Sequence, residues 1–261
     1  MNILVVNDDG IYAEGIERLA AALSETFDVY VCAPHEQRSA SGHGITIASP
    51  VEYEFAEFPK VRQAISLKGT PADCVKIGLE IYKGLGVTID KVFSGINHGA
   101  NLGTDTLYSG TVSAALEGAM CGLPSAAFSI NARKPKQFDT ALELAHRIAG
   151  LDYSRIDPRM TLNVNIPDLE KENIKGVKVT RLGIREYNEW YEKVSLESGN
   201  VGYRYSGYPV FYEGLTCDEN DIGADQEGYV SVTPLHFDLT GYDLMGKLKE
   251  VIEPPESESN R

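Results

Sequence analysis

The sequence is short of positive charge and has no long apolar run. Its 261 residues carry 24 lysines and arginines against 38 aspartates and glutamates, which gives a formal net charge of −14. That charge argues against binding to a nucleic-acid duplex or to anionic lipid. No window approaches the roughly 18 apolar residues that a membrane span needs. The apolar stretch near the N-terminus is also too short for a signal peptide, so we expect neither segment.

Cysteine is also scarce. The four cysteines stand at positions 32, 74, 121 and 217, and none of them belongs to a Cys-x-x-Cys pair. This spacing favours free thiols in a reducing compartment over a disulfide framework. We therefore expect a cytoplasmic protein.

Short apolar runs alternate with helical patterns along the first 183 residues. The predicted strands are 2–7, 28–34, 63–69, 90–97, 124–130, 161–167 and 176–183, the last two closing the sheet. The predicted helices are 14–25, 70–85, 109–122 and 138–150. Such strand–helix–strand units give parallel strands with right-handed crossovers. The pattern predicts an α/β fold: a Rossmann-like, mostly parallel sheet with helices on both faces.

The composition changes after residue 184, where tyrosine and glycine become frequent and helical periodicity is lost. This segment predicts an extended hairpin arm, whose aromatic side chains a second subunit or the chain's own core could cover. We divide the chain into an α/β core with the active site (1–183), an arm with a returning strand and helix for oligomerisation (184–250), and a flexible tail (251–261).

Polar residues gather at the carboxyl ends of the predicted strands, where open parallel sheets bind ligands. The first strand leads into Asp8 and Asp9, the second into a loop with Ser39 and His43, and strand 90–97 ends in Asn97. Carboxylate, hydroxyl and amide oxygens suit a hard divalent cation such as Mg²⁺ or Mn²⁺. The alternative is that an aspartate caps the following helix or shapes the turn.

The segment YSGTVSAALEG places Ser109, Gly110 and Thr111 at the start of a helix of small residues. The first N–H groups of a helix lack partners and carry partial positive charge, so this start is a candidate phosphate cradle. An ordinary Ser/Thr cap is the alternative. The segment is not a P-loop, because no GxxxxGK precedes it. A cation beside an anion cradle favours phosphate-ester chemistry.

Other classes of protein share parts of this pattern. Response-regulator receivers carry an acidic pair after the first strand, but they need an acceptor aspartate and a later lysine, where this chain has Ser94–Asn97 and Asn131. Aspartyl-phosphate phosphatases use Asp-x-Asp, whereas Asp8 and Asp9 are adjacent and alternate sides of an extended chain. A non-catalytic nucleotide-binding protein stays open, because the cradle alone would bind phosphate.

Five segments in order resemble the SurE (survival protein E) family of metal-dependent nucleotide phosphatases: ILVVNDDG, APHEQRSASGHGIT, GTPADC, SGINHGANLGTDTLYSGTVSAALEG and GYVSVTPLHFDLT. The resemblance implies a 5′- and/or 3′-nucleotidase that hydrolyses nucleoside monophosphates to nucleoside and phosphate with one Mg or Mn ion per subunit. It also implies a homodimer that exchanges the hairpin arm, sometimes assembled into a homotetramer. Because no nucleophile–base pair is recognisable, we expect metal-activated water to attack phosphorus directly.

The resemblance also assigns residues by motif. The metal is expected on Asp8, Asp9, Ser39 and Asn97, of which the two aspartates and Asn97 are also expected to be catalytic. The phosphate is expected near Asn101, Ser109, Gly110 and Thr111. His43 is a further candidate for substrate binding, because an imidazole in a rim loop can donate to an anion.

Overall fold

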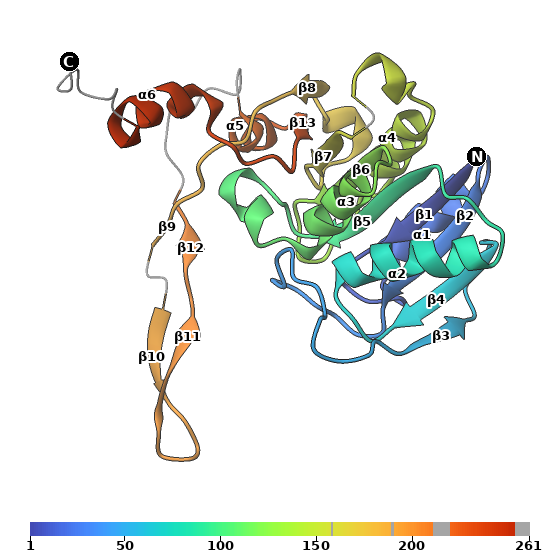
Figure 1. The fold of residues 1–261 in the computed structure, drawn as a ribbon, viewed down its shortest axis with the longest axis horizontal. Helices are drawn as coiled ribbons and strands as arrows, with labels where there is room; N and C mark the ends of the chain where they lie inside the picture. The colour runs from blue at the N-terminus through green and yellow to red at the C-terminus, as the bar shows by residue number, and fades with distance from the viewer. Residues whose placement is uncertain (158, 189–190, 211–219, 254–261) are drawn as a thin grey trace, which may run out of the picture.

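The computed structural model describes residues 1–157, 159–188, 191–210 and 220–253, and its centre is a nine-stranded sheet (Figure 1). The strand order is β3-β4-β2-β1-β5-β6-β7-β13-β8. Six strands from β4 to β7 are parallel, which confirms the predicted α/β fold. They are β4 (Gln63–Leu67), β2 (Asp28–Pro34), β1 (Asn2–Val6), β5 (Lys91–His98), β6 (Ser125–Ile130) and β7 (Thr161–Ile166).

Helices cover both faces of the sheet. On one face α1 (Glu14–Leu23) packs with α4 (Asp139–Ala149), and on the other α2 (Pro71–Gly84) packs with α3 (Gly110–Met120). The start of α2 shows why the sequence was sufficient to predict where this helix begins. Thr70 caps the helix and exchanges hydrogen bonds with Asp73, and Pro71 occupies the first turn, where a missing N–H costs nothing.

The edges of the sheet differ from the sequence prediction. Strands 161–167 and 176–183 were expected to close the sheet, and the structure places β13 (Val230–Leu235) between β7 and β8 (Val177–Val179). It runs antiparallel to β7 and parallel to β8. The opposite edge carries an unpredicted antiparallel strand, β3 (Tyr53–Ala56). The chain thus leaves the core after β8 and returns to it, while the domain boundaries drawn at 183 and 250 stay predictions.

The predicted hairpin arm is present. The strand β9 (Tyr187–Asn188) pairs with β12 (Tyr208–Pro209), and β10 (Tyr191–Ser195) pairs with β11 (Val201–Tyr205). Figure 1 shows this ribbon projecting away from the sheet, while α6 (Tyr242–Ile252) lies at the end nearest the C-terminus. A short helix, α5 (Asp221–Gln226), precedes β13.

The helix α6 has no buried residue. It occupies the first two positions of the predicted tail, and residues 254–261 lie outside the described part of the chain. Among the described residues, no helix combines the length and the apolar character that crossing a membrane requires.

The packing of α1 on β5 depends on Gly15. A Cβ at this position would lie 1.9 Å from the carbonyl oxygen of Ile96. We expect Gly15→Ala to lower the free energy of unfolding by about 1–3 kcal/mol, because the helix must move off the strand. Thermal denaturation would measure this. Gly246→Ala in α6 is the matched control, since its Cβ would meet nothing within 4 Å and its stability should not fall; equal stability of the two variants would contradict the packing argument.

Candidate active site

Asp8 lies directly beneath the first turn of α3. Asp8 follows β1 in the chain and is 5 % exposed. A Cβ added at Gly110 would lie 2.7 Å from the Cβ of Asp8. The hydroxyl of Thr111 donates to Asp8 Oδ1. Burial raises the pKa of Asp8 to about 6; the Thr111 bond opposes this shift and the neighbouring Asp9 charge adds to it. Neither of these two neighbours supplies a positive charge, so the site favours a cation.

The loop after β2 packs against this acidic pair. The N–H of Arg38 donates to the backbone carbonyl of Asp8 at 2.7 Å, and Gln37 Nε2 donates to Asp9 Oδ1 at 3.1 Å. Ser39 is the next residue, and it is exposed. The loop that carries Ser39 therefore contacts Asp8 and Asp9. The predicted metal site requires this proximity.

Asn97 belongs to the same edge through β5. The strands β1 and β5 are parallel, with Val6 opposite Ser94, so both chains reach the rim a few residues later. Asn97 Nδ2 donates to the Gly99 carbonyl at 2.8 Å, which orients the amide by its nitrogen. Asn7, buried before Asp8, has no hydrogen-bond partner for its Oδ1 among the described residues. The edge therefore offers oxygen ligands of the kind that hard cations accept.

The predicted phosphate cradle meets Asp8. Ser109 is the N-cap of α3 and accepts a hydrogen bond from the N–H of Val112 at 3.1 Å, so its oxygen serves the helix. Gly110 and Thr111 form the first turn that touches Asp8. Three of the four predicted phosphate residues thus stand next to the predicted metal residues, at the positive end of a helix.

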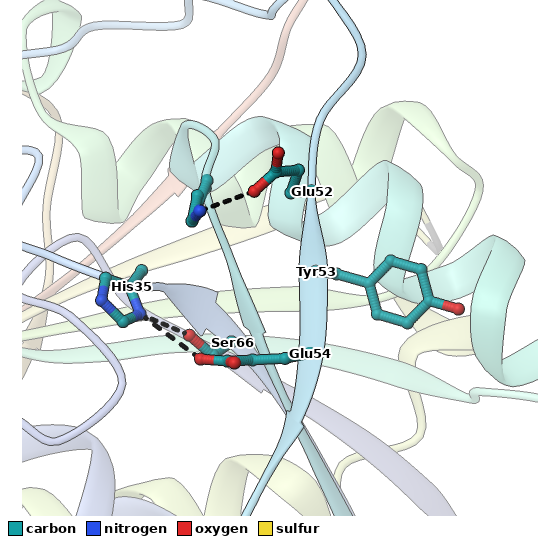
Figure 2. Close-up of a pocket in the computed structure, with 6 residues that line it drawn as sticks. His35, Glu52, Tyr53, Glu54 and Ser66 are labelled. Carbon is teal, nitrogen blue, oxygen red and sulfur yellow. Dashed lines mark hydrogen bonds and ion pairs between the residues drawn. The ribbon is translucent and has the colours of Figure 1, made fainter.

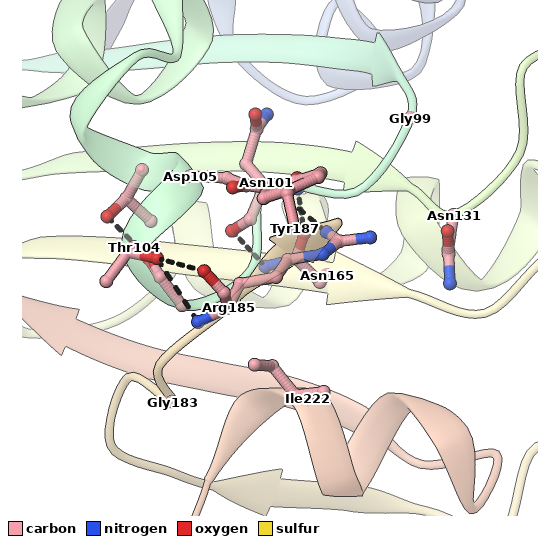
Figure 3. Close-up of polar contacts among 12 residues, drawn as sticks. Gly99, Asn101, Thr104, Asp105, Asn131, Asn165, Gly183, Arg185, Tyr187 and Ile222 are labelled. Carbon is pink, nitrogen blue, oxygen red and sulfur yellow. Dashed lines mark hydrogen bonds and ion pairs between the residues drawn. The ribbon is translucent and has the colours of Figure 1, made fainter. Parts of the chain in front are cut away.

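Asn101 is placed differently. Its Nδ2 donates to Ser129 Oγ at 2.8 Å, and its backbone N–H donates to Asn165 Oδ1 at 2.7 Å. Its carbonyl accepts from the side-chain amide of Asn163 and from that of Asn165, which lies beside Asn101 in Figure 3. These contacts tie the loop after β5 to β6 and β7, and the phosphate contact of Asn101 stays a prediction.

His43 is bound to a buried glutamate. Its Nε2 lies 2.8 Å from Glu117 Oε2, and Lys76 Nζ lies 3.0 Å from the other carboxylate oxygen. The Glu117 side chain is 4 % exposed, and the bond to His43, followed by Lys76, holds its pKa below the ordinary value despite burial. His43 therefore anchors its loop to α3, and the structure does not join it to the Asp8 cluster.

His35 belongs to a separate pocket. Its Nδ1 lies 3.1 Å from Ser66 Oγ and 3.7 Å from Glu54 Oε1, as Figure 2 shows. The cavity, which Glu52 and Tyr53 also line, measures about 80 Å³. Ligand pockets typically measure about 300–1,000 Å³, so this one is too small for a nucleotide.

Three buried polar residues that fix the loops around the site were not predicted: Asp221, Asn163 and Asn165. Asp221 on α5 accepts backbone N–H groups from Gly103 at 2.7 Å and Gly183 at 2.8 Å, which joins the loop before α3 to the base of the arm. The sequence carries no signal for this contact. For Asn163 and Asn165 a signal was present: polar residues at alternate positions of an apolar strand lie on the same face of the sheet, which indicates a shared polar partner there.

These elements define an α/β protein with an acidic cluster at the carboxyl edge of a parallel sheet, covered by a helix N-terminus. The family model described as "Survival protein SurE" matches residues 3–189, and the chain belongs to this family. The family suggested by the sequence motifs is thereby confirmed.

The similarity extends over nearly the whole chain. A protein of Petrotoga mobilis named "5′-nucleotidase SurE" is 44 % identical over 255 residues, which cover 97 % of this chain and 100 % of the relative. A protein of the same name from Pelotomaculum thermopropionicum is 42 % identical over 254 residues, which cover 97 % and 96 %. The crystal structure of the SurE protein from Aquifex aeolicus matches with a TM-score of 0.80 and 38 % identity, over 96 % of this chain and 99 % of that one.

We expect Glu117→Gln to lower the free energy of unfolding by about 1.5–3 kcal/mol near neutral pH, the usual worth of hydrogen bonds to a charged group. His43 and Lys76 bond this carboxylate, and Cys121 Sγ lies 3.9 Å from its Oε1. Because its folded pKa lies below 4.5, the ionised form contributes stability above that pH, and the contribution disappears as pH falls through the folded pKa.

Thermal denaturation of wild type and of Glu117→Gln, from neutral pH down through the folded pKa of Glu117, measures this difference. The control is Glu80→Gln, the same change at an exposed position of α2. A difference between wild type and Glu117→Gln that grows in acid would contradict the assigned sign.

Proposed function

We propose that the protein is a metal-dependent 5′-nucleotidase that hydrolyses nucleoside monophosphates to nucleoside and phosphate, with 3′-monophosphates as further substrates. The observation that carries the proposal is the contact between the buried Asp8 and the first turn of α3. It places a carboxylate that favours a cation against backbone N–H groups that favour an anion. The names of the relatives from Petrotoga and Pelotomaculum support the same activity.

One divalent ion per subunit, Mg²⁺ or Mn²⁺, would be held by Asp8, Asp9, Ser39 and Asn97. The donor set fits such an ion, because it consists of oxygens with two carboxylates, one of which, that of Asp8, is buried beside the charge of Asp9. When bound, the ion would polarise the phosphoryl group and activate water.

The chain's own residues orient the reaction. The first turn of α3 presents its N–H groups to the phosphate, and Gly110 leaves room where a Cβ would strike Asp8. Thr111 donates to Asp8 Oδ1 and so fixes which way the carboxylate faces. Water is the proposed nucleophile. The hydroxyl of Thr111, which donates to Asp8, is assigned to orienting that carboxylate, and no serine or cysteine with an adjacent base lies in this cluster among the described residues. Attack by water leaves no covalent phosphoenzyme.

The proposal includes assembly and compartment. We propose a homodimer that exchanges the arm, with a homotetramer as the larger form. The exposed apolar residues of the hairpin tip, Leu196 and Val201, and the exposed helix α6 support a partner surface there. A reducing cytoplasm is supported by the free thiols of Cys32, Cys74 and Cys121, while Cys217 lies outside the described residues.

Asp8→Asn tests the metal assignment. We expect it to reduce kcat/KM for nucleoside monophosphates by at least about a hundredfold, because one carboxylate ligand becomes a neutral amide. The circular dichroism spectrum should be unchanged, since the side chains are nearly isosteric. Asp139→Asn, at an exposed position of α4, serves as control and should keep full activity. Full activity of Asp8→Asn would refute the assignment.

Removal of the metal is a second test. Phosphate release from nucleoside monophosphates should stop in EDTA and return with Mg²⁺ or Mn²⁺, and wild type should gain thermal stability from either ion, because ligands that bind only the folded state stabilise it. Asp8→Asn should lose that gain. Rapid quench with labelled substrate should yield no phosphoenzyme. Nucleotide binding without any turnover under these conditions would instead indicate a non-catalytic binding protein.

A further inference from the structure

A larger cavity lies between the core and the base of the arm. It measures about 410 Å³, within the range of about 300–1,000 Å³ that small-molecule sites occupy. Three of its lining residues come from the core and three from the arm: Ala40, Asp105, Tyr108, Tyr187, Tyr191 and Tyr205. Four of the six are tyrosines, so its walls are mainly aromatic rings.

The cavity adjoins the candidate active site at two points. Ala40 directly follows Ser39, a proposed metal ligand, and Tyr108 directly precedes Ser109, the cap of α3. The two segments are joined by a hydrogen bond of 3.1 Å from the Gly42 N–H to the Tyr108 carbonyl. A molecule whose phosphate lies at the start of α3 would therefore extend its remaining part into this cavity.

The arm side of the cavity is held in place by a partly buried ion pair. Arg185 Nη1 lies 3.0 Å from Asp105 Oδ2, with side-chain exposures of 17 % and 20 %. The hydroxyl of Tyr187 donates to the same oxygen, and the Arg185 guanidinium lies 5.8 Å from the Tyr187 ring centroid. Figure 3 shows these three side chains gathered at one point. The Tyr187 ring is therefore fixed before any ligand arrives.

The other rings continue this wall. Tyr205 packs edge-on against Tyr187 at 6.3 Å and against Tyr191 at 5.8 Å between ring centroids. Tyr108 on the core side is 63 % exposed, so much of its ring can accept a further contact. Such rings present flat π-faces, and a planar aromatic ligand stacks on them with little demand for hydrogen bonding.

We propose that this cavity binds the nucleobase of the substrate and that Tyr108 and Tyr191 are residues that determine its specificity for nucleotides. The inference rests on the proposed function, since it takes the phosphate to lie at α3. The Asp105 carboxylate is paired with Arg185, so the cavity walls carry little net charge and suit an uncharged nucleoside. Because every base has a π-face, the site should accept purines and pyrimidines with similar affinity.

The first test compares substrates with and without a base. For wild type, kcat/KM for AMP, GMP, CMP and UMP should agree closely and exceed that for ribose 5-phosphate. In Tyr191→Ala, the ratio of kcat/KM for AMP over ribose 5-phosphate should fall about tenfold, through KM, as expected for loss of one stacking contact. Tyr108→Ala should act in the same direction, and Tyr191→Phe should retain the wild-type ratio because it keeps the ring.

The control is Tyr203→Ala. Tyr203 lies on the same hairpin and is 69 % exposed, but it does not line the cavity. Its ratio should match that of wild type. If the ratio in Tyr108→Ala and Tyr191→Ala also matches wild type, the inference is overturned while the phosphatase activity stands.

A second measurement does not depend on turnover. Adenosine, which carries no phosphate, should bind wild type in EDTA by calorimetry, and Tyr191→Ala should weaken that binding about tenfold while Tyr203→Ala should not. If the protein hydrolyses no phosphate ester but binds adenosine in this way, the proposed function fails and the nucleobase site stands. Adenosine binding that is absent, or unchanged in Tyr191→Ala, would overturn the inference.

Discussion

The burial of the Asp8 carboxylate against the first turn of α3 constrains the rest of the site. A buried charge without a counter-ion is costly, and a single hydroxyl donor from Thr111 offsets only part of that cost. The helix can approach because Gly110 has no Cβ there, and Gly118 allows the same helix to lie on β5 and β6, where a Cβ would come within 2.5 Å of Ser125 Oγ. The position of α3 is thus set by close contacts at two glycines.

The core of the fold was predictable because its signals are local. Apolar runs in parallel strands and the caps at Thr70 and Ser109 act within a few residues of chain, and each was found where expected. The two edges of the sheet were not predicted correctly, for a different reason. Tyr53, Glu54 and Phe55 do alternate as a strand requires, but β3 has only four residues, and so short an alternation is a weak signal. The insertion of β13 beside β7 depends on a pairing between segments about 70 residues apart, for which periodicity carries no information.

The site divides in the same way. Asp8, Asp9 and the start of α3 lie in short motifs whose neighbours the topology brings to one edge, so their meeting could be expected. The contacts of His43 and Asn101 could not be expected, because each is made with a distant polar partner: Glu117 for His43, and two asparagine side-chain amides of β7 for the backbone carbonyl of Asn101. The substrate contacts of both residues stay predictions.

A chain of net charge −14 can still bind an anion, because the potential at the site differs from the net charge of the chain. Only the phosphate needs positive potential, and the helix start and a bound cation would supply it over a few ångströms. The base of a nucleotide is flat and uncharged, and the surfaces beside the site are tyrosine rings, of which Tyr187 is held by Asp105 and Arg185. An acidic protein therefore needs no basic surface to select a nucleoside phosphate, provided that charge recognition is confined to α3 and stacking acts in the neighbouring cavity.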